Sequence, residues 1–243
     1  MSNKRFSQTT IVFDLDGTLI DTAPDLVAAT NHVLTSLSLP ELPSEALRPW
    51  ISFGAVRMIV EALATHGLSR PDGEHDALLE KFLDYYEANI ARCSRPFPHA
   101  LEAIESLKAQ GARVAICTNK REALSLKLLG ELGLTDHFAA IVGRDTLDVC
   151  KPDPGHLTGT IERAGGHIGR AIMVGDSQVD VATARAAGIP VVGVTFGYTD
   201  TPMATLMPDA LIDSFAALNP VLAELLFTDN IDRSAGQSED HAH

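Results

Sequence analysis

The chain has 243 residues, of which 45% are hydrophobic, and carries a formal net charge of −13 at pH 7. That length supports a substantial buried core, while the acidic balance argues against nucleic acid or an anionic membrane surface as a partner. No apolar run is long enough to span a bilayer. The three cysteines form no CxxC pair, which is typical of a reducing compartment, so we expect a cytoplasmic protein.

The first predicted element is a buried strand over Thr9–Phe13, which runs directly into Asp14 and Asp16. Side chains two residues apart on a strand point the same way, so these two carboxylates leave the strand end close together. Gly17 then allows a sharp turn. Two carboxylates at the end of a buried strand are costly unless a cation or a proton balances them. The pattern therefore predicts a Mg²⁺ site in which one carboxylate remains free to attack.

The next stretch, from Asp21 to about Arg92, is predicted to be all helical. Apolar spacing indicates helices over Asp25–Leu37, Ala55–Thr65 and 74–90, with no strand candidate among them.

From Pro98 onward the pattern alternates between helices and strands. Strands are predicted at 112–117, 138–142, 171–174, 190–194 and 210–212, with helices at 100–110, 121–132, 154–164, 178–187 and 215–226. Such alternation predicts an α/β fold, a doubly wound, Rossmann-like parallel sheet covered on both faces, with an inserted all-helical cap. We expect an α/β core at 1–20 and 93–227, a helical cap at 21–92 and a tail without regular structure at 228–243.

Further polar residues follow the later strands, and ligands in such sheets bind at the carboxyl ends of the strands. They are Thr118-Asn119-Lys120 after the strand ending at Cys117, Lys151 in the loop after Val142, and Asp176 with Asp180 after the strand ending at Val174. Together with Asp14 and Asp16 they offer carboxylates, a hydroxyl, backbone amides and a lysine. This set suits phosphoryl transfer.

Four short motifs occur in order along the chain: DLDGT at 14–18, TN at 118–119, KP at 151–152 and GDSxxD at 175–180. In these motifs the chain resembles the haloacid dehalogenase-like hydrolases. The resemblance implies that Asp14 is a nucleophile forming an aspartyl-phosphate and that Asp16 is the general acid and base. It also implies Mg²⁺ ligands at Asp14, the main-chain carbonyl of Asp16, and Asp176, with Asp180 as a water-mediated or more distant metal contact. Thr118, Asn119 and Lys151 would bind the phosphate.

Longer stretches resemble the bacterial phosphoglycolate phosphatases within this superfamily, including residues 13–26, 115–120 and 180–188. That resemblance implies hydrolysis of 2-phosphoglycolate, a small phosphorylated metabolite, by a monomer or homodimer. The cap would select the leaving group through the turn Ser52-Phe53-Gly54 and through Arg57. This chain carries Ser52 where members commonly have the first glycine of a Gly-x-Gly turn.

Other interpretations remain open from the sequence. The substrate could instead be a sugar phosphate, a nucleotide or pyrophosphate, and a non-catalytic phospho-acceptor or binding module is a rival of another class. Asp180 could be a first-turn helix charge, and Arg57 a solvated arginine on a helix surface.

Overall fold

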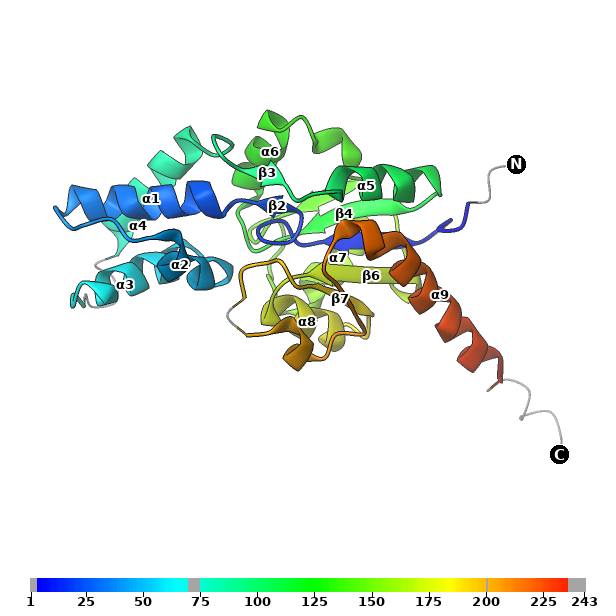
Figure 1. Ribbon diagram of the computed structural model, residues 1–243. Coiled ribbons are helices and arrows are strands. Elements are labelled where there is room, and N and C mark those ends of the chain that lie inside the picture. The colour runs from blue at the N-terminus through cyan, green and yellow to red at the C-terminus, as the bar shows by residue number, and fades with distance from the viewer. Residues whose placement is uncertain (1–3, 70–74, 200, 236–243) are drawn as a thin grey trace.

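A parallel sheet forms the centre of the molecule (Figure 1). The computed structural model describes residues 4–69, 75–199 and 201–235. Within them, six strands pair in the order β5-β4-β1-β6-β7-β8, and every neighbouring pair is parallel. The strands are β1 Thr10–Phe13, β4 Arg113–Cys117, β5 Ala140–Val142, β6 Ala171–Gly175, β7 Val191–Val194 and β8 Ala210–Ile212.

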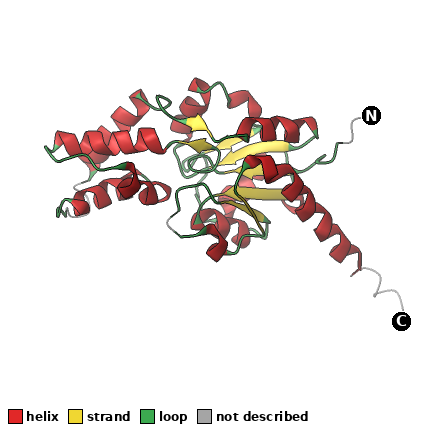
Figure 2. Cartoon of the chain, viewed as in Figure 1, coloured by secondary structure: helices red, strands yellow, loops and turns green. Residues whose placement is uncertain are grey.

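Helices cover both faces of this sheet (Figure 2). One face packs against α5 (Ala100–Ala109), α6 (Glu122–Glu131) and the start of α9 (Leu218–Ala235), and the other packs against α7 (Pro154–Arg163) and α8 (Gln178–Ala186). Along β1, Ile11 and Phe13 enter the first core and Val12 the second, as the alternation of a strand requires. Short 3-10 turns occur at Thr135–His137, Ile168–Arg170, Met203–Leu206 and Phe215–Ala217.

A second group of helices lies beside the sheet, on the left in Figure 1. It contains α1 (Ala23–Ser36), α2 (Ser44–Leu47), the 3-10 turn η1 (Arg48–Phe53), α3 (Ala55–Thr65) and α4 (Asp76–Ala88). Buried residues of these helices, including Leu34, Met58 and Phe82, pack on one another. Within the described part of the chain, no helix is long and apolar enough to cross a membrane.

Two chain segments connect this helical group to the sheet. They pair as a short antiparallel ribbon, β2 (Ile20–Asp21) with β3 (Arg95–Pro96). Next to the ribbon, the buried carboxylate of Asp25 accepts hydrogen bonds from the amides of Cys93 and Ser94 and from the Ser94 hydroxyl, the shortest at 2.7 Å. The carboxylate therefore ties the outgoing segment to the returning one.

The structure confirms the predicted fold class and corrects two details. Asp21, expected within an all-helical stretch, belongs to strand β2, because the chain pairs with Arg95 before it turns into α1. The last helix was expected to end at Leu226 and to give way to an unstructured tail at 228, yet α9 continues to Ala235. No glycine or proline stands between Leu226 and Gly236 to stop it. The expected helix start at 74 and the tail residues 236–243 lie outside the described residues.

Candidate active site

The loop after β1 presents the first two carboxylates. The Asp14 amide continues the sheet by donating to Val174 O at 2.9 Å, and the Gly17 amide closes a tight turn onto Ile20 O at 3.0 Å. Gly17 has φ +82°, and a Cβ there would lie 2.6 Å from Asp176 Oδ2. A glycine is therefore needed both for the backbone conformation and for the close approach of Asp176.

Asp176, after β6, is held by groups from two distant segments. Thr18 Oγ1 donates to Asp176 Oδ1 at 2.9 Å, and the amide of Tyr198 donates to Asp176 Oδ2 at 2.8 Å. Gly197 leaves the necessary space, since a Cβ there would lie 2.2 Å from Asp176 Cβ. The carboxylate is thus fixed in place with 1% of its residue exposed.

Asp180 and Lys151 form an ion pair behind Asp14. Ser177 caps α8 and donates its hydroxyl to Asp180 Oδ2 at 2.6 Å, in a reciprocal capping box. Lys151 Nζ lies 2.6 Å from Asp180 Oδ1 and 2.9 Å from Asp14 Oδ1. Asp180 therefore lies in the first turn of α8, as one interpretation of the sequence expects, and it is also fully buried and paired with Lys151.

The three buried carboxylates of Asp14, Asp176 and Asp180 can hold a metal ion, since one oxygen from each lies within 4.8 Å of the others. Burial raises the pKa of Asp14 to about 6, against the opposing charge of Lys151. Burial, with the charges of Asp180 and Asp14, raises the pKa of Asp176 to about 8. The buried ammonium of Lys151 pairs with Asp14 and Asp180, and a divalent cation would balance the charge that remains on the three carboxylates.

Lys151 itself remains protonated. Burial alone would lower its pKa, but the carboxylates of Asp14 and Asp180 outweigh burial and raise the pKa above its ordinary value. A permanently charged ammonium beside Asp14 is the kind of group that stabilises anionic oxygens.

The residues expected to bind phosphate meet at the same edge of the sheet. Thr118, 2% exposed, follows β4, and its hydroxyl accepts from the Lys120 amide at 3.2 Å. Asn119 Nδ2 donates to the Lys151 carbonyl at 2.9 Å, which joins the two loops. Thr118, Asn119 and Lys151 line one cavity together with Asp14 and Asp16.

One interaction at this edge of the sheet was not predicted from the sequence motifs. Lys120 Nζ lies 3.0 Å from Asp16 Oδ1 and donates to the Tyr86 hydroxyl at 2.6 Å. Tyr86 comes from α4, so the lysine links the helical group to the sheet. The position of Lys120 directly after the Thr-Asn motif could have identified it as a site residue, whereas nothing in the sequence around Tyr86 pointed to the site.

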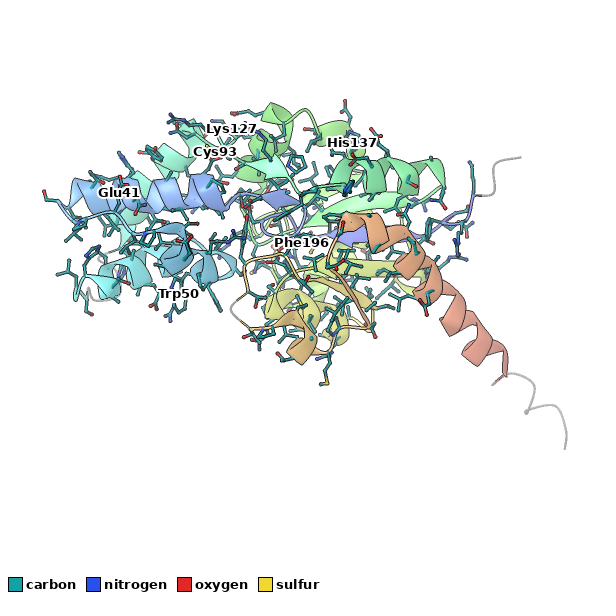
Figure 3. All side chains as sticks on the ribbon, in the orientation of Figure 1. Glu41, Trp50, Cys93, Lys127, His137 and Phe196 are labelled. Carbon is teal, nitrogen blue, oxygen red and sulfur yellow. The ribbon has the colours of Figure 1, made fainter. Side chains whose placement is uncertain are left out.

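The cavity lies between the helical group and the sheet and has a volume of about 410 Å³. Ser52, Phe53 and Gly54 line it, as the sequence predicts. Arg57 is not among the lining residues. It pairs with Glu61 at 2.7 Å, is 51% exposed, and lies over the ring of Trp50 on the outer side of the helical group (Figure 3).

Comparison with known proteins assigns the family. Residues 11–194 match the model of the haloacid dehalogenase-like hydrolases. The chain belongs to this family. A phosphoglycolate phosphatase of Mesorhizobium japonicum is 53% identical over 90% of this chain and 97% of the relative, and one of Agrobacterium fabrum is 47% identical over 88% and 92%.

A solved structure supports the same assignment. The crystal structure of a predicted phosphoglycolate phosphatase from Haemophilus somnus 129PT has a TM-score of 0.81 and 32% identity to this haloacid dehalogenase-like hydrolase, covering 89% of this chain and 98% of the other. The family expected from the four sequence motifs is thereby confirmed.

Proposed function

We propose that this hydrolase is a Mg²⁺-dependent phosphoglycolate phosphatase that works through an aspartyl-phosphate on Asp14. The observation that carries the proposal is the position of Asp14, whose carboxylate lies 2.9 Å from Lys151 Nζ within the buried acidic group. The substrate is suggested by the two relatives named above, which are phosphoglycolate phosphatases. The expected division into a core at 1–20 and 93–227 and a cap at 21–92 belongs to the same proposal.

In this proposal the phosphoryl group binds at the edge where β1, β4 and the Lys151 loop meet. The Thr118 hydroxyl, the Asn119 amide and Lys151 Nζ would bind its oxygens, and Asp14 would attack phosphorus. Lys151 offsets the repulsion between the carboxylate and the phosphate, because its ammonium stays charged. The ester oxygen then leaves on the side of Asp16.

Asp14, Asp176 and the main-chain carbonyl of Asp16 would hold Mg²⁺, with Asp180 acting from behind. Asp180 already accepts from Lys151 and Ser177, which favours a contact through water. The ion would supply positive charge to the phosphate oxygens and so lower the cost of bringing two anions together.

Asp16 would move the proton. Its side chain is 19% exposed and is paired with Lys120 outside the buried acidic group. In our proposal it donates a proton to the leaving alkoxide and later removes one from the water that hydrolyses the aspartyl-phosphate.

The proposal is tested by measuring phosphate release from a panel of esters with purified protein and Mg²⁺. The panel contains 2-phosphoglycolate, a hexose phosphate, a nucleoside monophosphate and pyrophosphate. We expect the highest kcat/KM for 2-phosphoglycolate. A higher kcat/KM for another ester of the panel would identify that class of compound as the substrate. Phosphate retained on the protein without turnover would indicate a phospho-acceptor module.

A further inference from the structure

The cavity wall beside Asp16 contains a buried cation that the proposed mechanism does not use. Lys120 has a side chain only 5% exposed. Among the described cations that line the cavity, Arg121 and Arg144 are exposed, and Lys151 is already paired with Asp14 and Asp180. Lys120 is therefore the buried ammonium that faces the side of the cavity away from the acidic group.

A ligand can replace one of the hydrogen bonds of Lys120. An ammonium has three protons, and Lys120 directs two at the Asp16 carboxylate, at 3.0 and 3.2 Å, and one at the Tyr86 hydroxyl. One bond to Asp16 is enough to keep that pair, so the second proton can turn to a ligand. The Tyr86 hydroxyl accepts from Lys120, and its own proton has no hydrogen-bond acceptor within residues 4–69, 75–199 and 201–226.

The position of Lys120 matches the shape of the leaving group. In 2-phosphoglycolate a single methylene separates the ester oxygen from the carboxylate. If Asp16 protonates that oxygen, the carboxylate must lie within a few bond lengths of Asp16, where Lys120 Nζ already makes its contact. Exposed arginines at the cavity mouth are less suited to such a short group, because the water around them screens the attraction.

We propose that Lys120 Nζ and the Tyr86 hydroxyl together bind the leaving-group carboxylate, and so select phosphate esters of short 2-hydroxy acids over esters of uncharged alcohols. This inference rests on the proposed phosphatase function and deepens it. A carboxylate that enters the cavity loses water and requires a cation and a hydrogen-bond donor in return. Since Tyr86 lies on α4 and Lys120 follows β4, the bound carboxylate would bridge the helical group and the sheet.

The test compares kcat/KM for 2-phosphoglycolate with that for ethyl phosphate, in which a methyl group replaces the carboxylate. Lys120→Met should lower the ratio of the two values at least about tenfold, because a site built for a polar group loses its discrimination when the partner is removed. Tyr86→Phe, which is nearly isosteric, should lower the ratio by a smaller factor. The ratio for Lys120→Arg should lie between that of the wild-type enzyme and that of Lys120→Met.

Matched controls are available close by. Lys127 of α6 (Figure 3) pairs at 3.5 Å with Glu87 of α4, and Tyr85 stacks on His32. Lys127→Met and Tyr85→Phe should leave the ratio unchanged. If Lys120→Met and Tyr86→Phe lower both activities equally, the pair serves Asp16 alone and the inference is wrong.

The outcomes also separate this inference from the proposed substrate. If the wild-type enzyme prefers 2-phosphoglycolate and both variants keep that preference, the proposed substrate stands and the proposed role of Lys120 is wrong. A wild-type enzyme that hydrolyses phospholactate but not 2-phosphoglycolate, with a ratio that depends on Lys120, overturns the substrate and supports the inference. No preference for any carboxylate-bearing ester would overturn both.

Discussion

Tyr198 connects Asp176 to the segment that leads into the helical group. Its amide donates to Asp176 Oδ2 at 2.8 Å, while its hydroxyl donates to Asp21 Oδ1 at 2.7 Å and accepts from the Ala23 amide at 2.8 Å. With 2% of the residue exposed, these contacts lie in the interior. A single residue, through its main-chain amide and its hydroxyl, thus fixes a candidate metal ligand and the start of α1 in one arrangement.

Tyr198→Phe removes the hydroxyl and leaves the buried Ala23 amide without its partner. We expect the free energy of unfolding to fall by about 1–3 kcal/mol, because no hydrogen bond then offsets the cost of removing the buried amide from water. Urea unfolding measures this change. Because the amide of residue 198 remains, the affinity for Mg²⁺ should change much less than the stability, and a selective loss of Mg²⁺ affinity would contradict this reasoning.

Gly197→Ala should damage the metal site directly. A Cβ at this position would lie 2.2 Å from Asp176 Cβ, so the carboxylate has to move. We expect Mg²⁺ to bind at least about tenfold more weakly, as measured by calorimetry. Gly130→Ala on α6 is the control, because a Cβ there comes no closer than 3.9 Å to another residue and alanine favours a helix. Equal Mg²⁺ affinity in both variants would show that Asp176 is not a ligand.

Lys151→Met should be strongly destabilising as well as inactive. The lysine lies between Asp14 and Asp180, and its removal leaves two buried carboxylates without a cation. Breaking such a buried pair costs about 3–5 kcal/mol. Unfolding by urea in EDTA measures the loss, and Lys127→Met, at an exposed pair, should change stability by less than about 1 kcal/mol.

The metal-free protein should lose stability as the pH rises. The pKa of Asp14, about 6, and that of Asp176, about 8, both exceed the ordinary 3.8. Between about pH 4 and 8 the folded state therefore binds more protons than the unfolded state, and the free energy of unfolding falls with pH. Burial lowers the pKa of His156 from 6.5. Below about pH 6.5 the unfolded state therefore binds more protons at His156, and this residue makes the free energy of unfolding rise with pH.

The window from pH 6.5 to 8 therefore isolates Asp176. In EDTA, the wild-type melting temperature should fall across it relative to that of Asp176→Asn. Added Mg²⁺ should raise the wild-type melting temperature more at pH 8 than at pH 6.5, because the ion binds the deprotonated carboxylates. A wild-type protein whose melting temperature rises with pH in EDTA, relative to the variant, would contradict the raised pKa of Asp176.

The sequence was sufficient to predict the parallel sheet and the residues at its carboxyl edge, because these follow from local rules. Continuous apolar strands identify a covered sheet, and polar residues directly after them must gather at one edge. Thr118, Lys151 and Asp176 are brought together in this way. The limit of the last helix was missed, since polar composition does not stop a helix when glycine and proline are absent.

Contacts between the helical group and the sheet could not be predicted in the same way. Lys120, after β4, meets Tyr86 of α4 across 34 positions of the sequence. Helical periodicity shows that a face is polar, but not whether that face lies over the cavity or toward solvent. For this reason the sequence left Arg57 open between a contact with the substrate and a solvated helix surface, and in the structure it is exposed and does not line the cavity.

The most direct test of the proposed function is whether the phosphoryl group passes through Asp14. Purified protein would be mixed with phosphate-labelled 2-phosphoglycolate and Mg²⁺ and quenched in acid within one turnover, and the label would be located on the chain by mass spectrometry. We expect label on Asp14, none in Asp14→Asn, and a loss of kcat of at least about 1,000-fold in that variant. Label on another residue, or full turnover by Asp14→Asn, would contradict the proposed function.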